Sequence, residues 1–552
     1  MLIGQPCHKK ITQFILKGPQ IMFVPRSKQT GFFDADALCE RLIPQDSFYR
    51  KFREIVWPII DDDQFEDMYC RANGRPPISP SLLAMATIFQ FYRDLSDREM
   101  ERAAMYDIEI KYALGLSIDE RPFDHSSLGD FRKLLLENGK EKETFDRILE
   151  HPVKAELIKR DEIQRIDATH VIADVAIPTM VTLVKKGIYE ILKPVMKRHK
   201  AMHEKIDSAI NSAEYSKKEI NHDAPGRLNI ENRKKKLVEV VKDARMVLEQ
   251  VKRIKGDEIL DRRVEMLRRI LQENITEDET GAAIEQDRKR KPPDIIVSPI
   301  DPDARYGAKS STKRFTGYKA NVTETVESRF ITNIKAMRGN RPDGSNMVEA
   351  VLEQREHGLR PVKLIGDTAY GDGIARKDLQ EEGVTVVAPL KEKNTRTRLI
   401  YPKSMFHYDE RKNLLTCPAG ITTKQSYWDR TKEIRMFHFP MTECGKCVRN
   451  AECTNSKDGR RTVGISKVNK ELREAEVYNL TEQFKEDMKL RPAVEGKLSE
   501  LVRYHGMRRA RYRGLQKVGL QCYFTAVAVN IKRWIKLELE KLKLRIPRPA
   551  IA

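Results

Sequence analysis

Two aspartates, Asp167 and Asp367, each belong to a short apolar segment typical of a buried β-strand. Asp167 lies near the start of residues 165–173, and Asp367 ends residues 361–367. If the two strands lie side by side, both carboxylates can reach the same metal ions. Mg²⁺ prefers oxygen ligands, and paired ions support phosphodiester cleavage by activating the attacking oxygen and stabilising the leaving one. Aspartate is also common in turns at strand ends, so the pattern alone leaves a purely structural role open.

A third acid, Glu495, follows Arg491 by four residues in a helical stretch near the end of the chain. Residues four apart project from one face of a helix, so both side chains can point toward the sheet or toward DNA. The alternative is an ordinary surface ion pair within the helix, which would contribute little.

Four of the eight cysteines cluster between residues 417 and 453. In a reducing cytosol they are not expected to form disulfides. Cys417 is separated by 26 residues from the pair Cys444 and Cys447, and Cys453 follows. Four thiolates can close a tetrahedral structural zinc site and stabilise a small unit that lacks a core of its own. Reduced, unliganded cysteines are the alternative, and a redox role is disfavoured because no thioredoxin-like βαβ pattern surrounds the pair.

A basic segment with interleaved aromatic residues follows the third acid. Such a composition suits phosphate binding and stacking on an unpaired base, although a solvated basic helix has the same composition. Its residues are Arg508, Arg509, Arg511 and Arg513, with Tyr504, His505 and Tyr512. Beyond it, apolar residues at helical spacing predict the buried face of a C-terminal helix: Leu520, Phe524, Val527 and Ile531.

Residues 34–150 are predicted to form helices that would place a DNA-binding unit ahead of these groups. Ser79 is predicted to be the N-cap of a helix whose first residue is Pro80. Residues 96–99 are predicted to form a capping box at the start of the next helix. A later helix near Asp124 would present Arg132 and Lys133. A helix-turn-helix-like unit and an ordinary helical bundle are both compatible with this pattern.

The acids themselves are predicted to lie on a mixed α/β sheet of the RNase H-like kind. After the strand at 165–173, residues 315–324 and 330–337 predict an antiparallel hairpin. A helix at 346–357 and the strand at 361–367 follow, and residues 384–389 form a further strand. The charged segment 185–292 predicts an inserted helical hairpin or coiled-coil arm, because apolar residues recur at steps of four and three: Leu237, Val241, Ala244, Leu248 and Val251.

The length and charge of the chain fit this division. At 552 residues the chain is longer than a single hydrophobic core usually organises. Its 102 Lys+Arg against 82 Asp+Glu give a formal charge of +20 with a pI near 9.4. Such an excess favours a polyanion partner such as DNA. Lys9, Lys10 and Lys17 interrupt any signal peptide, and no run of about 18 apolar residues occurs, so we expect a cytoplasmic protein without a membrane partner.

Several strings make the chain resemble the DDE transposases of bacterial insertion sequences along nearly its whole length. The strings are residues 74–77 and 124–128, Ile166-Asp167-Ala168-Thr169 with Ala173, Gly317-Tyr318-Lys319, Gly366-Asp367-Thr368-Ala369-Tyr370, Arg491-Pro492-Ala493-Val494-Glu495, and residues 508–515. The sequence departs from the family pattern at Met488, where a tyrosine is frequent, and at Val502, where a basic residue is frequent and Arg503 lies one position off.

The resemblance implies a catalytic triad of Asp167, Asp367 and Glu495 that binds Mg²⁺ or Mn²⁺, with Glu500 and Glu482 as alternatives for the third acid. It also implies a zinc unit held by Cys417, Cys444, Cys447 and Cys453 between the second and third acids. DNA contacts are expected from the arginines at the following positions: Arg491, Arg503, Arg508, Arg509, Arg511 and Arg513.

Four regions are therefore expected: an N-terminal helical DNA-binding domain at 1–150, the RNase H-like domain at 160–400 with its insertion at 185–292, a cysteine-rich unit at 401–465, and C-terminal helices at 466–552 that complete the catalytic domain. The implied activity is metal-dependent nicking at transposon ends, followed by attack of the freed 3′-hydroxyl on target DNA. A homodimer on DNA and association with the nucleoid are also implied. The alternatives are a non-catalytic DNA-binding protein on the same scaffold and an RNase H-like nuclease without strand transfer.

Overall fold

The computed structural model describes residues 25–26, 33–69, 77–175, 179–216, 230–287, 289–309, 312–390, 401–431 and 433–545. Residues 74–76 of the first resemblance string, and Lys9, Lys10 and Lys17, lie outside these ranges. Within the described ranges, none of the helices is both long enough and apolar enough to cross a membrane.

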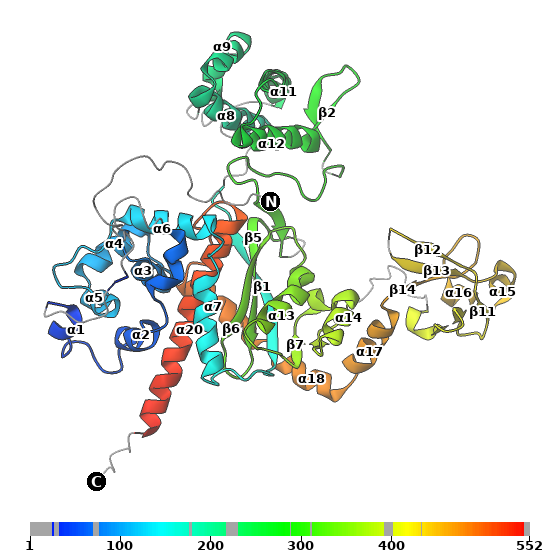
Figure 1. Ribbon diagram of the computed structural model, residues 1–552. Coiled ribbons are helices and arrows are strands. Elements are labelled where there is room, and N and C mark those ends of the chain that lie inside the picture. Colours follow the sequence, from blue (N-terminus) through cyan, green and yellow to red (C-terminus); the bar gives the residue numbers. More distant parts are fainter. Residues whose placement is uncertain are drawn as a thin grey trace, which may run out of the picture.

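A six-stranded mixed sheet lies at the centre of the structure, in the order β4-β5-β1-β7-β8, with β6 also pairing with β5 (Figure 1). β1 is antiparallel to β5 and parallel to β7, and β5 and β6 form the predicted antiparallel hairpin. The mixed α/β class is thereby confirmed, and the sheet is compatible with the RNase H-like expectation. The strands are β1 (Gln164–Ile172), β4 (Arg305–Ala308), β5 (Arg314–Thr325), β6 (Ile331–Arg338), β7 (Lys363–Ile365) and β8 (Thr385–Val387).

Helices cover both faces of the sheet, so most residues of the long strand β5 are buried, although many of them are polar. On one face, Val322 of β5 shares a core with Phe524 of the C-terminal helix α20 (Leu515–Arg545). On the other face, Ile166 of β1 packs with Met347 of α13 (Met347–Arg355). The four apolar residues predicted to pack the C-terminal helix, at positions 520, 524, 527 and 531, are all buried as expected.

The N-terminal helices form a bundle whose core is continuous with that of the sheet. Ser79 caps α3 by accepting a hydrogen bond from the Leu82 amide at 3.2 Å, and the capping box at 96–99 is present, both as predicted. The helices are α1 (Ala35–Leu38), α2 (Phe48–Val56), α3 (Pro80–Tyr92), α4 (Asp97–Tyr106), α5 (Ile108–Leu114), α6 (His125–Glu137) and α7 (Glu143–Lys154), with the 3-10 helix η1 (Asp62–Met68). Since α3 is enclosed by its neighbours and by α20, nearly all of its side chains are buried.

One prediction for this bundle is wrong. Arg132 of α6 is not presented to solvent: it is buried and donates to Asp97 at 2.6 Å, and its guanidinium lies over the ring of Tyr512. Only the neighbouring Lys133 is exposed as expected. Arg132 therefore links α6 to α4 within the N-terminal bundle and also contacts the C-terminal segment.

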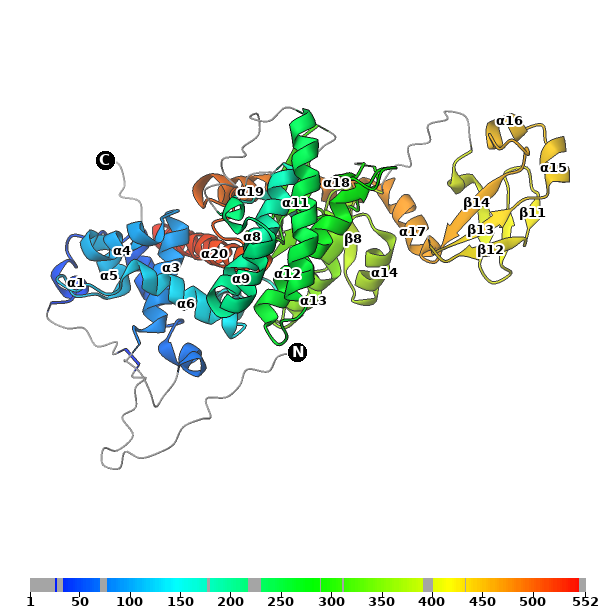
Figure 2. The same ribbon diagram turned by 90° about the horizontal axis from the view of Figure 1, so that it is seen from above.

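The charged insertion is a helical bundle with its own hydrophobic core, larger than the predicted two-helix hairpin or arm (Figure 2). Its apolar stripe, from Leu237 to Val251, faces inward against neighbouring helices. Its elements are α8 (Met180–Arg198), α9 (Lys200–Ala209), η2 (Ser212–Tyr215), α11 (Ile230–Val251), α12 (Glu258–Asn274), β2 (Ile275–Glu277) and β3 (Ala283–Glu285). The bundle begins about five residues before the predicted start at Lys185, because the first turn of α8 already contributes to this core.

The cysteine-rich region forms a separate small unit with two three-stranded sheets (Figure 1). Contrary to expectation, it has a hydrophobic core of its own, centred on Phe406, Leu415, Phe437 and Phe439. Its elements are η5 (Lys403–Met405), β9 (His407–Asp409), β10 (Leu414–Thr416), β11 (Thr422–Thr423), β12 (Ser426–Asp429), β13 (Ile434–His438), α15 (Met441–Lys446), α16 (Asn450–Cys453) and β14 (Thr462–Ser466). Three helices then return to the sheet: α17 (Asn469–Asn479), α18 (Glu482–Lys489) and α19 (Ala493–Tyr504).

A buried ion pair between β1 and β5 helps to hold α19 against the sheet. Arg165 of β1 donates to Glu324 of β5 at 2.7 Å, and both side chains are almost completely buried. Arg165 also donates to the carbonyl of Leu490, just before α19. Lys497 of α19 lies 4.0 Å from the other Glu324 oxygen. This network fixes the helix that carries Glu495 against β1.

We predict that Glu324→Gln lowers the free energy of unfolding by about 3 kcal/mol, because it leaves a buried guanidinium without its counter-charge. Chemical denaturation measures the change. The control is Glu327→Gln, which removes an exposed carboxylate paired with Lys159 at 2.9 Å and should cost less than about 1 kcal/mol. Equal losses for the two variants would show that the buried pair has no special role.

Candidate functional site

The parallel pairing of β1 with β7 brings the first two predicted acids together. Gln164 lies opposite Leu364 and Arg165 opposite Ile365, so continuing the register by two residues places Asp167 level with Asp367. Gly366, between the strand and the second acid, is required by close packing: a Cβ there would lie 2.7 Å from the Cβ of the buried Tyr370. The chain can therefore turn sharply after β7 while Asp367 stays beside β1.

Arg491 connects both aspartates with the third predicted acid. Its Nη2 lies 3.3 Å from Asp167 Oδ2 and 3.7 Å from Asp367 Oδ2, and its Nη1 lies 3.7 Å from Glu495 Oε1. Residues far apart in the sequence thus meet around one guanidinium.

Local backbone contacts orient the two aspartates. Asp167 Oδ1 accepts a hydrogen bond from the Ala168 amide at 2.7 Å, and Asp367 Oδ1 accepts one from the Ala369 amide at 2.8 Å. Asp367 in this way caps the 3-10 turn η4 (Thr368–Tyr370). In each aspartate one oxygen is held by the backbone, and the other oxygen faces Arg491.

Glu495 lies in the first turn of α19 and is the most exposed of the three acids, at 68% against 15% for Asp167 and 41% for Asp367. The two alternative acids are engaged elsewhere. Glu500 pairs with Lys532 at 2.7 Å and Glu482 with Lys485 at 2.6 Å. The geometry therefore favours Glu495 over both.

Burial raises the pKa of Asp167 to about 6. The hydrogen bond from Ala168 and the charge of Arg491 oppose this shift, whereas the nearby carboxylates of Asp367 and Asp343 reinforce it. A carboxyl group with a raised pKa near like charges is a feature of metal-binding and catalytic sites, because a cation relieves the repulsion.

We predict that Mn²⁺ binding to this site weakens as the pH falls from 7 to 5. Asp167 must lose its proton to become a ligand, so below pH 6 the affinity should fall by about tenfold per pH unit. Mn²⁺ titration of the full-length protein without DNA, at several pH values, measures the effect. An affinity that stays constant across this range would contradict the prediction.

A polar group behind the acids was not predicted. The Asp343 carboxylate accepts a hydrogen bond from Lys319 Nζ at 2.6 Å. Asn321 Nδ2 donates to the backbone carbonyl of Asp343 at 2.6 Å and to the hydroxyl of Tyr370 at 3.2 Å. Burial, followed by the charges of Asp167, Asp343 and Asp367, raises the pKa of Tyr370. Lys319 and Tyr370 belong to the resemblance strings, whereas no local signal in the sequence marks Asp343.

Apart from Arg491, which lies among the three acids, the predicted DNA-binding arginines fall into two groups. Arg508 and Arg511 are engaged in the fold: Arg508 donates to the carbonyl of His170 at 2.8 Å, and Arg511 donates to the carbonyl of Leu95 at 2.6 Å. Arg511 also pairs with Asp94 and lies over the ring of Phe91. The exposed members of the set are Arg503, Arg509 and Arg513.

The interleaved aromatic residues are divided in the same way. His505 is buried with its Nδ1 near the Phe91 carbonyl, and Tyr512 packs beneath Arg132, so neither ring is available to stack on a base. Only Tyr504, at 66% exposed, can do so. The basic segment therefore also has a structural role, because residues 508–510 form backbone hydrogen bonds with Ile172 at the end of β1.

All four predicted zinc ligands line one small cavity of about 20 Å³ in the cysteine-rich unit. None of them forms a disulfide. Burial raises the pKa of Cys453, against the charge of Arg461, and the other three cysteines raise it further. Their sulfurs are not gathered as closely as ligands on an ion, however. In the described structure the three ligand-type side chains within 4.8 Å of one another are instead Glu101, Asp124 and His125, in the N-terminal bundle.

Two of these side chains, Asp124 and Glu101, accept hydrogen bonds from backbone amides at the start of α6, and the ring of His125 contacts Glu101 at 2.9 Å. Asp124 caps α6 through the Ser126 amide at 2.8 Å, and Glu101 accepts from the backbone amide of His125 at 3.1 Å. The cluster is explained by these bonds.

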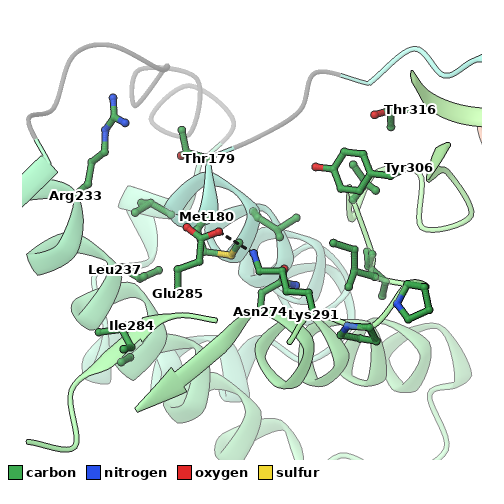
Figure 3. Close-up of a pocket in the computed structure, with 18 of the residues that line it drawn as sticks. Thr179, Met180, Arg233, Leu237, Asn274, Ile284, Glu285, Lys291, Tyr306 and Thr316 are labelled. Carbon is green, nitrogen blue, oxygen red and sulfur yellow. Dashed lines mark hydrogen bonds and ion pairs between the residues drawn. The ribbon is translucent and has the colours of Figure 1, made fainter. Parts of the chain in front are cut away.

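A cavity of about 1170 Å³ lies between the inserted bundle and the edge of the sheet (Figure 3). Tyr306 and Thr316 line it from the sheet, and Met180 and Leu237 from the bundle. Glu285 and Lys291 pair within it at 2.7 Å. None of the predicted catalytic, DNA-binding or zinc-binding residues lines this cavity, so it is separate from the acidic site.

Chemically, the acidic site offers three carboxylates of different exposure around one guanidinium, at the place where β7 ends beside β1. Such a donor set suits a hard divalent cation.

Comparison with known protein families finds two matches. Residues 38–134 match a transposase domain (DUF772), and residues 416–535 match a transposase DDE domain. The first match runs from the last residue of α1 into α6, and the second covers most of the cysteine-rich unit, Arg491, Glu495 and the basic segment. Asp167 and Asp367 lie outside both matches. No curated protein and no solved structure gives a significant match.

Proposed function

Because this chain carries an N-terminal transposase domain and a C-terminal transposase DDE domain, we propose that it is a DNA transposase of RNase H-like fold. It binds the terminal inverted repeats of an insertion sequence, cleaves a DNA strand there and joins the freed 3′ end to target DNA. The observation that carries this proposal is the convergence of Asp167, Asp367 and Glu495 around Arg491.

The three acids fit a divalent metal. Two of them keep one carboxylate oxygen bound to a backbone amide and direct the other toward Arg491. Burial, reinforced by the nearby carboxylates of Asp367 and Asp343, raises the pKa of Asp167, and a bound cation would stabilise its charged form. Asp167, Asp367 and Glu495 would hold Mg²⁺ or Mn²⁺. When bound, the metal supplies Lewis-acid activation of the attacking oxygen and stabilisation of the leaving one.

The protein's own residues would then position the DNA. The exposed arginines Arg503, Arg509 and Arg513 can bind phosphates, whereas Arg508 and Arg511 support the surface from within. A homodimer would hold the two transposon ends, and DNA binding would associate the protein with the nucleoid.

The cysteine-rich unit would bind a structural Zn²⁺ through Cys417, Cys444, Cys447 and Cys453. Their arrangement around one cavity, and the absence of disulfides among the described cysteines, support this role. Zinc binding requires the sulfurs to draw closer than they lie in the described structure.

The test of the proposal is a joining assay with the protein and DNA that carries the inverted repeats flanking its gene. In Mg²⁺, we expect cleavage at the repeat ends and covalent joining of these ends to a second DNA. Cleavage without joining would identify an RNase H-like nuclease. Binding of the repeats without cleavage in either Mg²⁺ or Mn²⁺ would identify a non-catalytic DNA-binding protein.

A further inference from the structure

The Arg491 guanidinium occupies the centre of the acidic site, but it is held there loosely. Of its three contacts with carboxylates, only the one to Asp167, at 3.3 Å, has hydrogen-bond geometry. The contacts with Asp367 and Glu495, both 3.7 Å, are too long for hydrogen bonds. Its Nε is buried and has no hydrogen-bond partner in the described structure.

The nearby Arg165 shows what a fixed arginine looks like in this fold. Arg165 contacts a single carboxylate, that of Glu324, at 2.6 and 2.7 Å, donates to a carbonyl and is almost fully buried. Arg491 is instead 21% exposed, and it lies in the short connection between α18 and α19, where a long side chain can turn outward without moving a strand.

The position of Arg491 conflicts with metal binding. A divalent cation held by Asp167, Asp367 and Glu495 would approach the same oxygens that the guanidinium contacts, and the two positive charges would repel each other at short range. Without either cation, three carboxylates would face one another around a partly buried point, which is costly.

We propose that Arg491 is the counter-cation of the metal-free site, and that a divalent metal displaces its guanidinium from the three acids. This inference rests on the metal site of the proposed function. Arg491 is here a positioning residue that holds the acids together until metal arrives, and the displaced guanidinium is then free to bind a DNA phosphate.

The test is a Mn²⁺ titration of the full-length protein without DNA, with free Mn²⁺ followed by electron paramagnetic resonance. Arg491→Gln is expected to bind Mn²⁺ about tenfold more tightly than the unmodified protein, because no resident cation has to be expelled. Arg491→Lys, which keeps the charge, should stay within about threefold of the unmodified protein. The control is Lys489→Gln, which removes a positive charge two residues away that pairs with Glu486 at 2.6 Å and should leave the affinity unchanged.

A second measurement uses Arg491→Ala, in which the space of the guanidinium is vacated. Millimolar guanidinium ion should weaken Mn²⁺ binding to this variant more than the same concentration of NaCl does, since only guanidinium can refill the site. If Arg491→Gln binds Mn²⁺ no more tightly and guanidinium does not compete, the proposed displacement is wrong.

Asp167→Asn separates this failure from failure of the metal site itself. If Asp167→Asn lowers Mn²⁺ binding, the metal site stands, whatever Arg491 does. If Mn²⁺ binding is the same with and without the Asp167 carboxylate, the metal site is absent, and the proposed function fails together with the inference.

Discussion

Asp367→Asn is expected to lower DNA strand cleavage by at least about 1,000-fold while leaving repeat binding within a few-fold of normal. The amide keeps the shape of the side chain and can still accept the hydrogen bond from Ala369, so the turn after β7 should remain intact. The variant loses the negative charge that would hold the metal. A catalytic metal stabilises the transition state by several kcal/mol, and every 1.4 kcal/mol lost slows the reaction by about tenfold.

The chain offers a closely matched control five residues later. Asp372 is also an exposed aspartate that caps the following helix, α14 (Gly373–Glu381), through the amides of Ile374 and Ala375, both at 3.0 Å. Asp372→Asn keeps this cap and should retain normal cleavage. A gel assay of nicked repeat DNA, beside a binding assay on the same samples, measures both quantities. Equal cleavage by the two variants would remove Asp367 from the catalytic site.

Cys447→Ser is expected to remove zinc from the purified protein and to make residues 401–465 at least about tenfold more sensitive to limited proteolysis. A structural zinc site contributes its binding free energy to folding, about 10–16 kcal/mol in isolated zinc-finger peptides. The unit already has a small core around Phe437 and Phe439, so we expect local opening and not complete unfolding.

Zinc content by mass spectrometry and the pattern of tryptic fragments measure this effect. Cys39→Ala serves as the control, because Cys39 is a buried cysteine at the end of α1, far from the unit in the sequence, and should leave the zinc content unchanged. If the protein purified without chelators holds no zinc, and chelators do not alter its proteolysis, the four cysteines have no structural metal.

The parts of the fold that follow from local patterns could be predicted from the sequence. The Ser79 cap, the hairpin of β5 and β6, and the order of strand, hairpin, helix and strand all depend on residues close together in the chain. The placement of Asp167 beside Asp367 could also be expected, since the sequence places each aspartate near an end of a short apolar segment, and the structure pairs these segments in parallel in one sheet.

The environment of individual side chains could not be predicted, because it depends on segments hundreds of residues apart. Arg508, Arg509, Arg511 and Arg513 form a uniform basic string, yet Arg511 pairs with Asp94 and Arg508 with a carbonyl of β1. Nothing in the string itself distinguishes these from the exposed members.

The same limit applies to the inserted bundle and to the rear of the acidic site. The apolar stripe from Leu237 to Val251 is equally compatible with a two-helix arm and with a bundle. It shows which face of α11 is buried, but not that α8 packs against that face. Asp343 reaches the acidic site through the turn after β6, and its only sign in the sequence is an ordinary turn composition.

The shared core of the N-terminal helices and α20 has a consequence for biosynthesis. The first helical bundle, which ends at Lys154, buries part of its apolar surface against a helix that begins at Leu515, about 360 residues later. At 5–20 residues per second, the ribosome needs about 20 to 70 s to supply that helix. During this interval the nascent chain exposes an incomplete hydrophobic face, so its solubility would depend on chaperones, and chains released before α20 would be targets for proteolysis.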